Sequence, residues 1–119
     1  NRRIHSVAGK FSIEDELALM NRLDAMVSMD SANQHMASLA GTPVVSVWGS
    51  TTPACGFMAY RQNPANAVCL GLECQPCSVA GKPTCPREHF ECMHGISPDM
   101  IVSRVLDVIT VKPDNTTEL

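Results

Sequence analysis

The chain has 119 residues and a formal net charge of −3, so it can bury one core but is short for a complete doubly wound sheet. Its few lysine and arginine residues are scattered, which excludes the basic stripe that a nucleic-acid-binding domain needs. No apolar run reaches the roughly 20 residues that span a bilayer, and no signal-type apolar segment follows the N-terminus. We therefore expect a cytoplasmic chain, and its start at Asn1 rather than at a methionine indicates a fragment or an excised domain.

Two elements are predicted near the N-terminus. Residues 4–8 are predicted to form a short strand, and residues 13–23 a helix that follows a serine N-cap. In this helix Ile13, Leu17 and Met20 recur at steps of four and three residues. This spacing predicts that all three side chains face the core.

Two apolar runs predict the strands of the sheet. Residues 25–29 are interpreted as a short buried strand, and residues 44–48, which are rich in β-branched side chains, as a strand buried on both faces. Between them residues 35–40 continue a helix that Gly41 ends. Because a strand, a helix and a strand follow one another over about 25 residues, we expect two parallel neighbouring strands.

The remaining elements lie in the second half of the chain. Residues 67–70 are a candidate for a last short strand. Ser97 and the proline that follows it are typical of a helix start, and this helix is predicted to run to about residue 109. Its apolar face contains Ile101, Val105 and Val108.

The turn after the first buried strand is the strongest candidate for a binding site. Asp30 lies at the carboxyl end of that strand, and Ser31, Ala32 and Asn33 open the next helix. Ligands of open α/β sheets bind at this edge, and a helix N-terminus presents N–H groups that suit a phosphate or diphosphate. The alternatives are that Asp30 is only an N-cap and that His35 is a satisfied structural histidine.

A second loop follows the second strand and is expected to lie near the first. Gly49 ends the strand, most simply to allow the turn, and three hydroxyl side chains follow it, among them Thr51. These hydroxyls either contact the same ligand or only cap the next segment.

A cysteine-rich loop spans residues 69–94. Two of its cysteines are separated by two residues, a spacing that lets both thiolates bind one zinc ion, and two more complete a tetrahedral set. The candidate ligands are Cys74, Cys77, Cys85 and Cys92, with His89 and His94 as possible replacements. The alternatives left open are reduced thiols packed as small apolar groups and, least favoured, disulfides.

Short motifs follow one another along nearly the whole chain. In order they are Gly9-Lys10-Phe11-Ser12, Asp30-Ser31-Ala32-Asn33-Gln34-His35, Gly41-Thr42-Pro43, Gly49-x-Thr51-x-Pro53 and Cys74-x-Pro76-Cys77. In this order and spacing they resemble the C-terminal half of family 9 glycosyltransferases, the lipopolysaccharide heptosyltransferases. The sequence departs from the family pattern at Ala32, where many members have glycine.

The resemblance implies an α/β fold with a parallel sheet and flanking helices, as a partial Rossmann-like domain from the C-terminal half of a GT-B glycosyltransferase. Residues 1–112 would form an incomplete nucleotide-sugar-binding domain, and residues 113–119 a frayed tail. The donor-binding residues it implies are Asp30, Ser31, Ala32, Asn33, His35, Gly49 and Thr51.

The same resemblance implies an inverting transfer of a sugar, usually from ADP-heptose, to the lipopolysaccharide inner core, with no metal required for the reaction. The acceptor and the catalytic base would belong to an N-terminal domain that is absent here, so the chain alone is expected to be inactive. The complete protein would work at the inner face of the inner membrane, with peripheral membrane association. The alternatives are a family 9 enzyme with another sugar nucleotide and a separate metal-binding interaction module.

Overall fold

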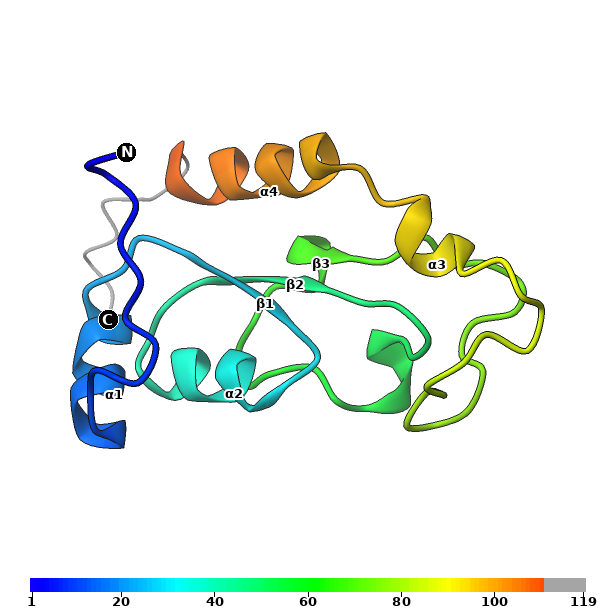
Figure 1. Ribbon diagram of the computed structural model, residues 1–119, viewed down its shortest axis with the longest axis horizontal. Helices are drawn as coiled ribbons and strands as arrows, with labels where there is room; N and C mark the ends of the chain where they lie inside the picture. The colour runs from blue at the N-terminus through cyan, green and yellow to red at the C-terminus, as the bar shows by residue number, and fades with distance from the viewer. Residues whose placement is uncertain (111–119) are drawn as a thin grey trace.

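A computed structural model describes residues 1–110. Its sheet contains β1 (Met26–Met29), β2 (Val44–Val47) and β3 (Ala67–Val68), in the order β1-β2-β3, and both pairings are parallel. Helices lie on both faces of this sheet (Figure 1). The predicted α/β fold, with a parallel sheet and flanking helices as in a partial Rossmann-like domain, is therefore confirmed.

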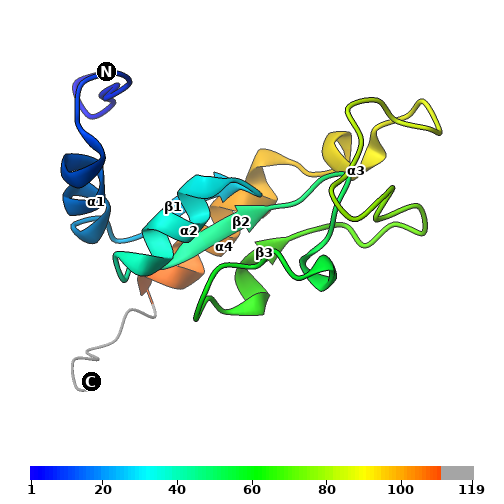
Figure 2. The same cartoon turned by 90° about the horizontal axis from the view of Figure 1, so that it is seen from below.

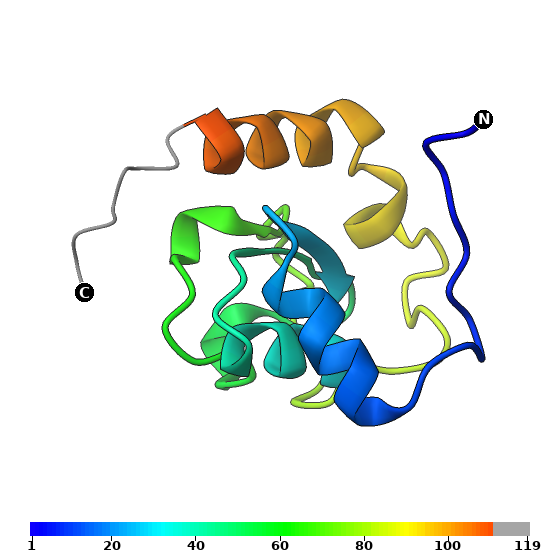
Figure 3. The same cartoon turned by 90° about the vertical axis from the view of Figure 1, so that its left-hand side faces the viewer.

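The longer helices form the outer layers. Helix α4 (Pro98–Thr110) crosses one face of the sheet and contacts β2. Helix α2 (Ala32–Leu39) covers the other face, and α1 (Ile13–Asn21) packs beside α2 (Figure 3). In the described residues no helix combines the length and the apolar character needed to cross a membrane.

The central strand is the most buried element. All four residues of β2 are buried because β2 pairs on both sides and has helices above and below it. By contrast, β1 pairs on one side only, and Val27 and Met29 are 49% and 47% exposed. The prediction that residues 25–29 form a buried strand was therefore wrong in its burial, although the strand itself is present.

The core between α1, α2 and the sheet is centred on Met20, Ala37 and Val44. The buried Thr42 hydroxyl donates to the Met20 carbonyl, which fixes the end of α1 against the sheet. Ile13 is 60% exposed, so the prediction that it faces the core was wrong. The reason is geometric, since only the C-terminal half of α1 reaches this core.

The N-terminal segment differs from its prediction. Residues 4–8 are exposed and contain no strand. Local turns use the backbone groups there, because Ile4 N–H donates to the Asn1 carbonyl and Lys10 N–H to the Val7 carbonyl. A short segment with two polar residues among its apolar ones does not form a strand when no neighbouring strand pairs with it.

The C-terminal helix matches its prediction. The Ser97 hydroxyl accepts a hydrogen bond from Met100 N–H at 3.4 Å, as an N-cap does. The predicted apolar face is half-buried, comprising Ile101, Val105 and Val108. The predicted tail, residues 113–119, lies outside the described residues.

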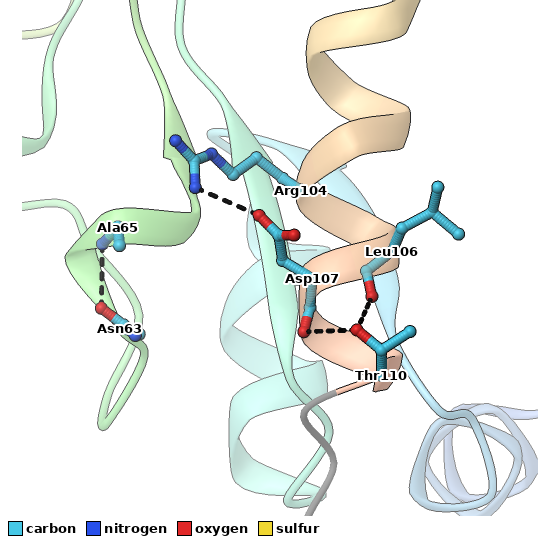
Figure 4. Close-up of polar contacts among 6 residues, drawn as sticks. All are labelled: Asn63, Ala65, Arg104, Leu106, Asp107 and Thr110. Atoms are coloured by element: carbon cyan, nitrogen blue, oxygen red, sulfur yellow. Dashed lines mark hydrogen bonds and ion pairs between the residues drawn. The ribbon is translucent and has the colours of Figure 1, made fainter.

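The exposed face of α4 carries only local polar contacts (Figure 4). Arg104 pairs with Asp107 at 3.5 Å, and the Thr110 hydroxyl donates to the Leu106 carbonyl at 2.6 Å. An exposed pair of this kind stabilises the helix by a few tenths of a kcal/mol, about 0.3–0.5. Figure 4 also shows the Asn63 side chain accepting from Ala65 N–H, which caps the short helix η2 (Pro64–Asn66).

The strands end toward the same end of the molecule. Beyond that edge lie η1 (Pro53–Cys55), the irregular residues 69–90 and the one-turn helix α3 (Glu91–His94), as Figure 2 shows. Both loops singled out in the sequence are therefore at the carboxyl edge of the sheet.

Candidate functional site

The first loop joins β1 directly to α2. Ser31 is extended, with φ −155° and ψ 173°, and α2 begins at Ala32, so the helix starts earlier than the expected tight turn allowed. The Ser31 hydroxyl does not cap the helix, because it lies 3.1 Å from the Ser28 hydroxyl and donates to the Met29 carbonyl at 3.4 Å. The first-turn N–H groups of α2 consequently face the carboxyl edge without a side-chain cap from Ser31.

A buried glutamine that the sequence analysis missed supports this turn. Gln34 is 1% exposed, and its Nε2 donates to Asp30 Oδ1 at 3.1 Å and to the Phe57 carbonyl at 3.2 Å. The interpretation of Asp30 as the N-cap was wrong, since Ser31 holds the N-cap position and the Asp30 carboxylate accepts from Gln34. The four-residue spacing of an acid and an amide was the available signal in the sequence.

The other predicted residues of this turn are exposed at the same edge. Ala32, Asn33 and His35 lie in the first turn of α2, and all three are exposed. Within residues 1–110 the His35 imidazole makes no hydrogen bond or ion pair with the protein, so it is not a satisfied structural histidine. Its side chain is free to meet a ligand.

The second loop is occupied by contacts with the cysteine-rich loop. The Thr51 side chain is 6% exposed, and its hydroxyl donates to the Val79 carbonyl at 2.9 Å. The Gly49 carbonyl accepts from the Gln75 side chain at 2.5 Å. Thus the structure uses the Thr51 hydroxyl and the Gly49 carbonyl for packing of the loops, and a donor contact at either residue stays a prediction.

Gly49 packs against the flexible side chain of Met93. Its φ is not in the left-handed region, and a Cβ added there would lie 2.6 Å from the Met93 sulfur. The expectation that Gly49 serves the turn was therefore wrong. The side chain that packs against it comes from α3, more than forty positions away in the sequence.

The two loops lie side by side, as predicted. Gln34 links the Asp30 turn to the backbone at Phe57. Hydrogen bonding with the Thr51 side chain and with the Thr52 backbone lowers the pKa of the Cys55 thiol, and the nearby Asp30 carboxylate acts in the opposite direction. Both observations place Asp30 beside the segment that follows β2.

A cavity of about 540 Å³ lies at the other edge of the sheet and does not include either loop. Gln62 in its lining accepts from Val44 N–H at 2.8 Å and donates to the Ser38 hydroxyl at 2.7 Å and the Thr42 carbonyl at 3.0 Å. Its amide is thus fully committed to holding the start of β2 against the end of α2. We assign this region a structural role.

The cysteine-rich loop holds the candidate metal ligands. All six cysteines of the chain are free thiols, which does not favour the disulfide interpretation. Among residues 1–110 no three histidine, cysteine or carboxylate side chains are already gathered as a metal site. Zinc and reduced thiols both remain open for Cys74, Cys77, Cys85 and Cys92.

A family model and two curated proteins match this chain, and all three are heptosyltransferases. The model of glycosyltransferase family 9 (heptosyltransferase) matches residues 1–87. The chain is 24% identical over 110 residues to lipooligosaccharide heptosyltransferase 2 of Campylobacter jejuni subsp. jejuni serotype O:6, a match that covers 92% of this chain and 34% of that protein. It is 22% identical over 109 residues to the protein of the same name from serotype O:2, covering 92% of this chain and 33% of that protein.

The chain thus spans about a third of the length of these curated relatives. No solved structure matches it.

Proposed function

Because the chain belongs to glycosyltransferase family 9, we propose that it is the donor-binding part of a glycosyltransferase that takes a nucleoside-diphosphate sugar. The observation that carries this proposal is the turn from Asp30 to His35. It is exposed at the carboxyl edge of a parallel sheet, it opens α2, and the buried Gln34 ties it to the Phe57 carbonyl in the segment after the second loop. Nucleotides bind at this edge in open α/β sheets.

The chemistry of the turn suits a diphosphate. The N–H groups of the first turn of α2 point out of the helix, and the helix dipole adds a partial positive charge there. Ala32 is small enough for a phosphate to approach the backbone. As the bond to the sugar breaks, negative charge develops on the leaving diphosphate, and fixed N–H donors stabilise it.

Two exposed side chains are proposed to contact the transferred sugar. The Asp30 carboxylate, held by Gln34, is suited to accept hydrogen bonds from sugar hydroxyls. His35 lies in the first turn of α2 and is exposed, so its imidazole can reach a ligand bound at the helix end.

The finer assignments follow from the family. The relatives are named as lipooligosaccharide heptosyltransferases, so we propose ADP-heptose as the donor and the lipopolysaccharide inner core as the acceptor. We further propose a GT-B architecture, inversion at the anomeric carbon, and a catalytic base and acceptor site outside this chain. On this account the chain alone transfers no sugar, and the protein works in the cytoplasm at the inner membrane.

Substitution of Ala32 tests the proposed phosphate contact. Ala32→Pro removes one N–H from the first helical position, where proline is well tolerated, and the extended Ser31 before it suits a following proline. In the complete protein this variant should bind ADP more weakly while its thermal stability is kept. Ala32→Ser, which retains the N–H, is the matched control. Equal ADP affinity in both variants would contradict a phosphate at this turn.

A panel of sugar nucleotides with the complete protein tests the identity of the donor. Turnover of ADP-heptose is the expected result. Turnover of another sugar nucleotide instead would support the proposed transferase activity but contradict ADP-heptose as the donor.

A further inference from the structure

The loop between β3 and α3 lacks the usual means of stabilisation. Residues 69–90 contain no helix or strand, and loops longer than about 15 residues without such elements are uncommon in compact domains. None of the described side chains in this range is buried. Leu70, Leu72 and Phe90 are only half-buried, so apolar burial holds the loop weakly. Small segments with little core of their own are commonly held by disulfides or a metal.

Four cysteines of this region share one neighbourhood. Cys74, Cys77 and Cys85 line a single cavity of about 350 Å³. Cys92, the first buried residue after the loop, is 5% exposed. Cys92 lies two residues after Phe90, whose backbone N–H donates to Cys85 Sγ at 3.4 Å.

Backbone N–H groups of the same loop contact the Cys85 sulfur. Phe90 and His89 each donate a backbone N–H to Cys85 Sγ at 3.4 Å. The backbone that aims them is unusual, since Glu88 and Phe90 have φ of 58° and 49° although neither is glycine. Each such residue costs about 1–3 kcal/mol, and the two N–H groups that this backbone aims at Cys85 Sγ favour a thiolate there.

We propose that these four cysteines bind one Zn²⁺ as a tetrahedral tetrathiolate. The ligands are Cys74, Cys77, Cys85 and Cys92. Each thiol loses its proton to solvent on binding, so one Zn²⁺ replaces four protons and the site carries a formal charge of −2. Lys82, Arg87 and Glu73 line the same cavity, so its two cationic side chains offset part of this charge and Glu73 adds to it. Since the four sulfurs are not already gathered at ligand distance, binding the ion draws the loop together.

The chemistry favours four sulfur ligands over a set that includes histidine. His89 Nδ1 accepts a hydrogen bond from Glu91 N–H at 3.0 Å, and His94 is exposed on α3 against the Phe90 ring. Both imidazoles are thus directed elsewhere. Four thiolates in tetrahedral array are a closed structural site with no open position for catalysis.

The loop that the zinc closes lies directly on the second loop of the sheet edge. Cys77 N–H donates to the Ser50 carbonyl at 2.9 Å, and the Val79 carbonyl accepts from Thr51. The ion would therefore fix residues 49–51. The metal site itself rests on the cysteines alone and does not depend on the proposed donor site.

Metal analysis of the complete protein tests the proposal. The protein is purified with a phosphine reductant and without chelator, and its metals are measured by mass spectrometry. We expect one zinc per chain, lost in Cys77→Ser and kept in the matched control Cys69→Ser, whose sulfur lies outside the cavity lining. Iron in place of zinc, no bound metal, or equal loss in both variants would overturn the assignment.

Two measurements on the unmodified protein avoid dependence on variants that fail to fold. Replacing zinc by Co²⁺ should give the visible absorption of tetrahedral cobalt thiolate. Removing the metal with a chelator should speed tryptic cleavage after Arg87, which is exposed in the loop. A colourless cobalt sample, or cleavage at an unchanged rate, would contradict a zinc ion that closes this loop.

Discussion

Gln34 offers the sharpest test of how the candidate site is supported. Gln34→Leu keeps a side chain of similar size in a position that is 1% exposed, but it removes the hydrogen bonds to Asp30 and Phe57. Each bond contributes about 1 kcal/mol net, so the free energy of unfolding should fall by about 2 kcal/mol. The bond to Asp30 alone, at about 1 kcal/mol, corresponds to about a fivefold loss of affinity if it positions the carboxylate for the donor.

Urea unfolding and binding of ADP-heptose to the complete protein are the two assays. The matched control is Gln62→Leu, which also loses an amide network but at the opposite edge of the sheet. Both variants should be destabilised, and only Gln34→Leu should bind the donor more weakly. The reasoning is refuted if Gln34→Leu binds as tightly as the wild type, or if Gln62→Leu weakens binding equally.

Two further predictions concern the contacts between the loops. Gly49→Ala should lower the free energy of unfolding by about 0.5–1.5 kcal/mol in a denaturant titration, because the new methyl group forces the Met93 side chain out of its rotamer. Asp30→Asn should lower the pH at which iodoacetamide alkylates Cys55 at half its maximal rate. The sign follows from the charge, since the Asp30 carboxylate raises the pKa of the Cys55 thiol and the amide does not.

Controls for these variants are available in the same chain. Shortening the opposing side chain in the Met93→Ala background should relieve most of the cost of Gly49→Ala, and an unchanged cost would show that the overlap is not its cause. Asp15→Asn, on α1 at the far end of the molecule (Figure 1), should leave the alkylation profile of Cys55 unchanged. A profile that shifts equally with both aspartate variants would contradict the proximity of Asp30.

Sequence pattern predicts well the elements whose apolar side chains all find neighbours in the fold. The β-branched run of β2 matches a strand enclosed on both sides, and the apolar spacing of α4 matches the face that contacts β2. The same kind of pattern predicts wrongly where burial or strand pairing needs a neighbouring strand that is not there. Val27 looks like a core residue, but β1 pairs on one side only in the described structure, and residues 4–8 have no strand to pair with.

The candidate site likewise has some features that the sequence predicts and others that only the tertiary structure shows. The turn at Asp30 and its closeness to the second loop follow from the strand-helix-strand order, so the sequence predicts them. The role of Gln34 does not follow, because a glutamine in a helix is usually exposed and only the tertiary fold brings the Phe57 carbonyl to it. Likewise, the side chain that packs against Gly49 is that of Met93, which no local pattern connects to it.

The most direct test of the proposed donor site is an ADP titration followed through backbone amide NMR signals. The account predicts that the amides of residues 31–37 and 49–52 shift together, because the two loops line one binding site at the carboxyl edge of the sheet. Shifts confined to residues 60–63, at the cavity on the other edge, would contradict it, as would a folded protein whose loop amides do not respond.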